Sequence, residues 1–91
     1  MIIKHFFRDG EKMMSHFLEH GEATNCNSFE EYLIKANKVI ENPKAKCKRE
    51  TDDGDNDRVY YLAETGEIVF LSGDGCIRTY YIADDEYFKR Q

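Results

Sequence analysis

Two histidines and an arginine are the side chains of this sequence best suited to proton transfer beside a bound anion. His16 and His20 lie four residues apart in H-F-L-E-H-G, and this spacing places them side by side on one face of a helix. Histidine can accept or donate a proton near neutral pH, because its ordinary pKa is about 6.5. Arg78, in D-G-C-I-R-T-Y-Y, keeps its charge and offers a planar fork that matches phosphate oxygens.

The residues after Arg78 add polar and aromatic groups on a predicted strand. Thr79 could donate a hydrogen bond to a phosphate or orient an imidazole, and Tyr80 or Tyr81 could stack on a base or donate a phenolic proton. Neighbouring side chains of an ideal strand point to opposite faces, so Arg78 and Thr79 could share one site only where the strand is twisted or bulged. The two expected faces carry Ile77, Thr79 and Tyr81 on one side, and Arg78, Tyr80 and Ile82 on the other.

Each of these groups also has a purely structural interpretation. The histidine pair could be a partly buried helix face, or could hold zinc together with Cys26, although no third ligand in register is visible. The residues from Thr79 to Tyr81 could form ordinary cross-strand pairs. Arg78 could be a surface partner of Asp74 or Glu67. These alternatives remain open at the level of the sequence.

Two helices are predicted in the first half of the chain. The spacing of Met13, Met14, Phe17 and Leu18 favours a helix over residues 10–20 that ends at Gly21. Ser28 followed by Glu31 is typical of a capping box, and an apolar stripe continues from there to Ile40. Asn42 should end this second helix, because a residue before proline avoids the helical region. Residues 1–7 could be a short strand or a helix start.

Beyond Pro43 the apolar period changes to two, which indicates strands. We expect strands over 47–51, 58–62 and 67–72, and a fourth that runs from the turn at Gly73 to Ile82. The expected fold is α+β, with two N-terminal helices packed on one face of a four-stranded antiparallel meander. A short terminal helix could form through Tyr87 and Phe88, in an acidic tail over 83–91 that follows a core at about 10–82.

Length and composition limit the classes of protein. Ninety-one residues make a single small domain, and no apolar run is long enough to span a membrane, so we expect a cytoplasmic chain without a membrane partner. Three cysteines without a C-x-x-C pair predict reduced, mostly buried thiols.

The acidic run at 52–57 lacks the downstream glutamate of a calcium loop and is expected to be a solvated loop. A net charge of −5 argues against a simple nucleic-acid binder, although residues 35–49 could form a local basic stripe.

The order of these motifs resembles a known nuclease superfamily. Five motifs follow one another over residues 14–81. They are H-F-L-E-H-G, S-F-E-E-Y-L-I-K-A-N, a K-R-containing strand, a hairpin with Y-Y and T-G-E-I-V-F, and D-G-C-I-R-T-Y-Y. This combination looks like the small nuclease domains of the barnase, EndoU, colicin and RelE-like superfamily, in the branch found in phage genomes and polymorphic toxins. The resemblance implies a ribonuclease that needs neither metal nor cofactor and often acts on tRNA, with an immunity protein or a host protein as a further partner.

Carried over by position, the resemblance places His16, His20, Arg78, Thr79 and Tyr80 or Tyr81 at the active site, with Lys48 or Arg49 as a basic substrate-binding position. The histidines would then act as base and acid in either order, and Arg78 would stabilise the phosphorane. The competing hypothesis is a non-enzymatic phage-encoded inhibitor that presents acidic residues to a host nucleic-acid-binding protein, on a degenerate nuclease fold. Such an inhibitor would depend on exposed acids such as Asp52, Asp53, Asp84 and Asp85.

Overall fold

The first two helices lie where the sequence predicts them. The computed structural model of the protein describes residues 3–49 and 57–90. Helix α1 spans Gly10–His20 and begins after Asp9, whose side chain accepts a hydrogen bond from the backbone N–H of Lys12. It ends at Gly21, where a Cβ atom would lie only 2.6 Å from the carbonyl oxygen of Phe17. Glycine is required there because the chain turns so close to the helix.

Helix α2 spans Phe29–Glu41 and has a conventional cap at each end. The Ser28 hydroxyl accepts a hydrogen bond from the backbone N–H of Glu31, 3.1 Å away. Asn42, before the proline, leaves the helical region with φ −72° and ψ 121°. The apolar stripe of α2 is buried, so this helix provides the main cover of the sheet.

Four strands form an antiparallel meander in the order β1-β2-β3-β4. The strands are β1 (Lys46–Arg49), β2 (Arg58–Leu62), β3 (Glu67–Leu71) and β4 (Ile77–Ile82). Gly66 and Gly75 take positive φ values of 78° and 92°, which the turn from β2 to β3 and the turn from β3 to β4 need. The α+β architecture predicted from the sequence is therefore confirmed, with β1 and β4 as the two edges of the sheet.

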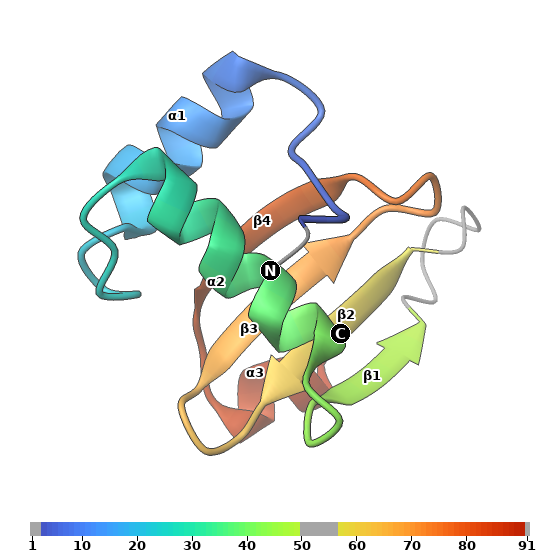
Figure 1. The fold of residues 1–91 in the computed structure, drawn as a ribbon. Helices are drawn as coiled ribbons and strands as arrows, with labels where there is room; N and C mark the ends of the chain where they lie inside the picture. Colours follow the sequence, from blue (N-terminus) through green and yellow to red (C-terminus); the bar gives the residue numbers. More distant parts are fainter. Residues whose placement is uncertain (1–2, 50–56, 91) are drawn as a thin grey trace.

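Helices cover both faces of the sheet (Figure 1). Helix α2 crosses β2 and β3, whereas α1 lies against the edge strand β4. On the other face the short helix α3, Asp85–Lys89, packs Tyr87 and Phe88 on a cluster of Val59, Tyr61, Ile68 and Phe70. The short terminal helix considered from the sequence is thus present, and it belongs to the packed structure.

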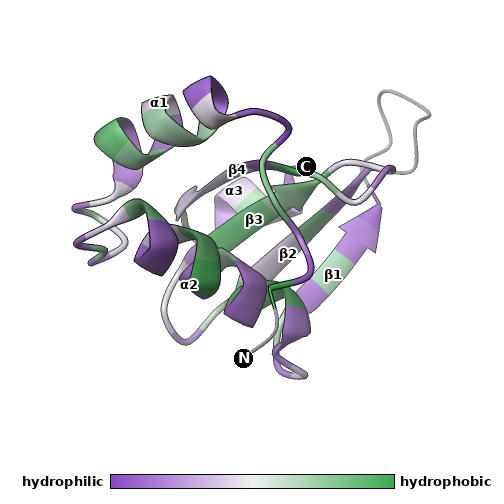
Figure 2. Ribbon diagram, turned by 45° about the horizontal axis from the view of Figure 1, so that its top comes forward, coloured by the Kyte–Doolittle hydropathy of each residue, from purple (hydrophilic) through white to green (hydrophobic). Residues whose placement is uncertain are grey.

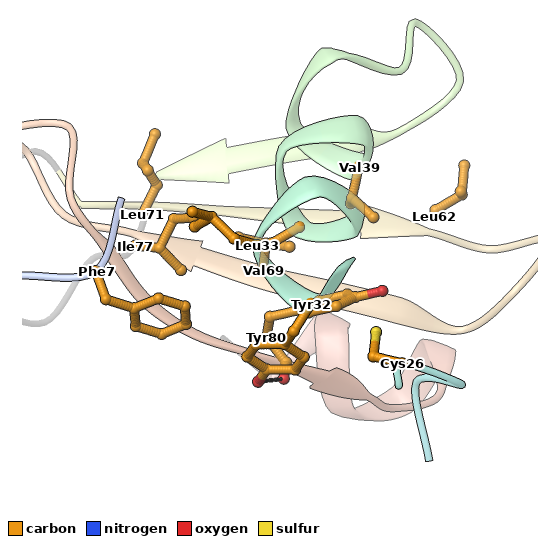
Figure 3. Close-up of a cluster of buried hydrophobic side chains, with 11 residues drawn as sticks. Phe7, Cys26, Tyr32, Leu33, Val39, Leu62, Val69, Leu71, Ile77 and Tyr80 are labelled. Carbon is orange, nitrogen blue, oxygen red and sulfur yellow. Dashed lines mark hydrogen bonds between the residues drawn. The ribbon is translucent and has the colours of Figure 1, made fainter. Parts of the chain in front are cut away.

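The larger core lies between the sheet and α2, and the ribbon of β3 beneath this helix is strongly hydrophobic (Figure 2). Tyr32 and Tyr80 are fully buried at its centre, and the Tyr32 hydroxyl donates a hydrogen bond to the backbone carbonyl of Tyr80 (Figure 3). Asn37 is also fully buried, and its side chain bonds the backbone of Lys4 and His5. The N-terminal segment is therefore fixed to α2 by a polar contact.

A bulge changes which residues of β4 face the core. Leu71 pairs with Ile77 and Phe70 pairs with Thr79, so Arg78 is an extra residue between the two pairs. Ile77 and Tyr80 consequently lie in the same core, and Tyr81 packs against the second cluster under α3. The predicted grouping of Ile77 with Thr79 and Tyr81 is wrong for this reason.

The N-terminal segment runs beside β4 for a single parallel bridge between Phe7 and Ile77, so residues 3–7 are neither a full strand nor the start of a helix. The described residues contain no helix whose length and apolar character would let it cross a membrane. Of the predicted strand at 47–51, residues 50 and 51 lie outside the described part of the chain.

Two predictions about burial need correction. The cysteines are free thiols as predicted, but only Cys26 is buried, and Cys47 on the edge strand is exposed. Asp57, expected in a solvated loop, is buried. The other residues of that acidic run, including Asp52 and Asp53, lie outside the described residues.

Candidate active site

The structure brings the first histidine of α1 to the edge of β4. His16 Nδ1 lies 3.1 Å from Thr79 Oγ1, a hydrogen-bond distance, although 63 residues separate them in the sequence. The ring of Phe7 stacks on the His16 ring with 5.6 Å between centroids. When Nδ1 carries the proton and donates a hydrogen bond to Thr79 Oγ1, Nε2 is left bare and can accept a proton. These two contacts therefore fix the orientation of the imidazole.

His16 is held in its neutral form more strongly than an ordinary histidine. Its pKa is lowered from the usual 6.5, first because burial penalises the charged ring and then because His20 repels a second positive charge. A neutral imidazole at pH 7 can act as a proton acceptor. The geometry and the electrostatics of His16 thus both suit a general base.

Arg78 is fixed by a carboxylate that comes from the start of β2. The Nη1 atom of Arg78 lies 2.7 Å from Asp57 Oδ2, and Asp57 Oδ1 also accepts a hydrogen bond from the backbone N–H of Gly73. The Arg78 side chain is 47% exposed, whereas that of Asp57 is almost fully buried. The buried carboxylate therefore positions a guanidinium group that solvent, or a phosphate, can reach. Asp57 is thus the described carboxylate that meets Arg78, where the sequence suggested Asp74 or Glu67.

His16 and Arg78 line one cavity of about 230 Å³ beside the turn between β3 and β4. This volume is several times the ~30 Å³ that a water molecule occupies in the liquid, so a phosphodiester group fits. Arg8 and Lys12 line the same cavity, and Arg8 also forms an ion pair of 2.8 Å with Asp74. Three cationic side chains thus surround one neutral imidazole on a protein whose net charge is −5.

His20 and Tyr81 lie next to His16 rather than among the described residues that line the cavity. The rings of His16 and His20 stack with 6.1 Å between centroids, and the His20 ring stacks on Tyr81 at 5.0 Å. The Tyr81 hydroxyl shares a hydrogen bond with the hydroxyl of Tyr87 on α3. The result is a row of stacked rings that runs from Phe7 through His16 and His20 to Tyr81.

Tyr80 has no place in this site. Its side chain is fully buried in the core, and its hydroxyl donates a hydrogen bond to a carboxylate oxygen of Glu67. Burial, followed by the Glu67 carboxylate, raises the pKa of this phenol. The prediction that Tyr80 contacts substrate is therefore corrected: the bulge at Arg78 turns Tyr80 toward α2.

The predicted basic positions on β1 also lie away from the histidines, because β1 and β4 are opposite edges of the sheet. Lys48 Nζ stands 4.7 Å from the centroid of the Phe88 ring, on the face that α3 covers. Arg49 lines a different cavity, together with Arg58 and His5. Neither residue is among the described residues that line the cavity at His16.

Three residues of the site were not identified from the sequence. Lys12 stands four residues before His16, so it lies on the same helix face as His16 and His20. The four-residue spacing could therefore have identified it. Arg8 and Asp57 carry no local signal, because their positions depend on the N-terminal segment and on the pairing of β2 with β3.

Within residues 3–49 and 57–90, no three histidine, cysteine or acidic side chains gather closely enough to hold a metal ion. Cys26, considered as a zinc ligand, is buried, and its Sγ atom lies 3.4 Å from the Thr24 hydroxyl. Comparison with models of known protein families gave no match to this chain, and comparison with curated proteins gave none either.

Proposed function

We propose that this domain is an endoribonuclease that cleaves RNA by acid–base catalysis, with His16 as the general base. The observation that carries the proposal is the position of His16: its Nδ1 lies 3.1 Å from Thr79 Oγ1, and its ring lines the same cavity as Arg78. Three groups therefore meet in one place. They are a neutral imidazole, a hydroxyl that orients it, and a guanidinium group that a phosphate can reach. This combination suits transfer of a proton beside a phosphodiester.

In the proposed reaction, His16 Nε2 removes the proton of a ribose 2′-hydroxyl, and the 2′-oxygen attacks the adjacent phosphorus. The bond from phosphorus to the 5′-oxygen breaks, and the leaving oxygen takes a proton from an acid. The products are a 2′,3′-cyclic phosphate and a free 5′-hydroxyl. No change of oxidation state and no further reactant is involved.

Arg78 stabilises the negative charge that grows on the phosphorane oxygens, because a fixed guanidinium group needs no reorganisation during the reaction. Its contact with the buried Asp57 supports this role by holding the group in one orientation. Lys12 and Arg8 line the same cavity and add positive potential for an anionic substrate.

His20 is the candidate for the acid. Its ring stacks beside that of His16, and repulsion between the two rings disfavours a proton on both. A protonated imidazole at this position could donate its proton to the leaving oxygen. Thr79 acts as a positioning residue, since it touches His16 and not the substrate.

The proposal is tested by incubating the purified protein with total tRNA and with a labelled single-stranded RNA in the presence of EDTA. We expect cleavage that yields 2′,3′-cyclic phosphate ends, and no cleavage of an oligonucleotide with 2′-deoxyribose throughout, since it lacks the nucleophile. His16→Gln should lower the rate by about 10²–10⁴-fold. The matched control is Ser15→Ala, an exposed neighbour on the same helix, which should leave the rate unchanged.

Two results would overturn the proposal: intact RNA after prolonged incubation with wild-type protein, or equal cleavage by wild type and His16→Gln. The first would favour the competing hypothesis of an acidic binding protein. That protein would tolerate His16→Gln and depend on exposed acids such as Asp84 and Asp85 at the start of α3.

A further inference from the structure

Two arginines stand directly opposite each other on neighbouring strands. Arg49, the last residue of β1, pairs in register with Arg58, the first residue of β2. Opposed residues of an antiparallel pair point to the same face of the sheet and come within about 4.5–5.5 Å of each other at Cβ. Like charges in this arrangement destabilise a sheet. An anion near the two side chains would relieve this repulsion.

These arginines line a cavity of about 480 Å³, on the face of the sheet where Tyr60 packs against the larger core. His5 joins them from the N-terminal segment and is fixed by a 2.9 Å contact between its Nδ1 and the carbonyl oxygen of Gly75. No acidic residue is found among the described residues that line this cavity. Two permanent cations, a histidine and a half-buried tyrosine are groups that phosphate and a nucleobase can both contact.

The cavity adjoins the candidate active site. Ser72 lines this cavity and both cavities around Arg78, and Gly73 lines two of the three. The turn from Ser72 to Gly75 lies between the two cationic regions, and it carries Asp74, whose carboxylate is paired with Arg8. A flexible polyanion can lie across such a turn and contact both regions at once.

We propose that the cavity between Arg49 and Arg58 is a second phosphate subsite, which binds a neighbouring phosphate of the RNA strand whose scissile phosphate lies between His16 and Arg78. This inference rests on the proposed ribonuclease function and adds a requirement for substrate length. It explains how an acidic protein can bind RNA: the cations gather on the two sides of one turn. It also explains the opposed arginines, because a phosphate can accept hydrogen bonds from both guanidinium groups.

The test compares Arg49→Gln/Arg58→Gln with Lys44→Gln/Lys89→Gln, a control pair of exposed lysines outside the three cavities that also removes two positive charges. Binding of a fluorescent single-stranded RNA 12-mer is measured by anisotropy, with His16→Gln added to every protein to prevent cleavage. We expect the arginine variant to bind about ten- to a hundredfold more weakly than the control. Its plot of log affinity against log salt should be shallower by about 0.7 for the lost phosphate contact.

Two further measurements separate binding from folding and from catalysis. Removal of the like-charge pair should raise the melting temperature by about 2 °C, whereas arginines with a structural role would lower it when removed. With His16 intact, the arginine variant should cleave a dinucleoside monophosphate at the wild-type rate, because that substrate carries only the scissile phosphate. It should cleave a 12-mer more slowly.

Equal binding by the arginine and lysine variants would overturn this inference and leave the proposed function untouched. A loss that appears equally with the dinucleoside monophosphate and the 12-mer would also overturn it, because the arginines would then act on the scissile phosphate or on the fold. A third outcome is also distinguishable: wild-type protein does not cleave RNA, and the arginine variant loses RNA binding while the lysine variant keeps it. In that case the phosphate subsite stands and the ribonuclease proposal fails.

Discussion

Asp57 Oδ2 lies 2.7 Å from Arg78 Nη1, and the same carboxylate accepts a hydrogen bond from the backbone N–H of Gly73. A single buried side chain thus connects the start of β2, the turn before β4 and the bulged residue of β4. This contact gives Arg78 a defined position although the residue is an interruption in the pairing of β3 with β4. The orientation of the candidate phosphate-binding group therefore depends on a residue that would not touch the substrate.

Substitution of this carboxylate should affect stability as well as activity. Asp57→Ala leaves the Gly73 N–H and the Arg78 guanidinium group without their acceptor, and we expect the free energy of unfolding to fall by about 2 kcal/mol. Urea denaturation measures this change. The matched control is Glu64→Ala, which removes an exposed partner of Lys44 and should cost much less. Equal losses in the two variants would show that the contact of Asp57 has no special role.

The Thr79 hydroxyl should act on His16 rather than on the substrate. In Thr79→Val the side chain keeps its shape but loses the contact with Nδ1, so we expect kcat to fall about tenfold while KM stays constant, and Thr79→Ser should retain most of the rate. Nitrogen NMR of the His16 ring provides a readout that is independent of activity. Wild-type protein should show mainly one neutral tautomer, and the valine variant a mixture. An unchanged tautomer in Thr79→Val would contradict the positioning role.

His16 should lower the free energy of unfolding as the pH falls below about 6.5. Because its pKa in the folded protein lies below the ordinary 6.5, the unfolded chain binds a proton more readily as the pH falls through 6.5. The contribution of His16 to stability is therefore fully present above pH 6.5, and it declines from there down to its lowered folded pKa. His16→Gln removes this part of the slope, which urea titrations between pH 5 and pH 8 would reveal. Parallel pH profiles for wild type and variant would show that the ring titrates as it does in the unfolded chain.

Local patterns in the sequence predicted most elements of the fold. The side chains of Asp9 and Ser28 begin the two long helices, and glycine at positions 66 and 75 allows the tight turns of the meander. Caps, turns and apolar periods are properties of a few adjacent residues, so they can be recognised without knowledge of the tertiary structure. The adjacent positions of His16 and His20 follow from helical geometry in the same way.

The tertiary structure alone decided which of the candidate residues meet. The bulge at Arg78 brings Arg78 and Thr79 to the region of His16 and turns Tyr80 into the core. Asp57, His5 and the opposed pair Arg49 and Arg58 acquire their positions through strand register and through contacts between distant segments. Register and bulges result from the packing of whole strands and helices against one another, and a local sequence period carries no information about such long-range pairings.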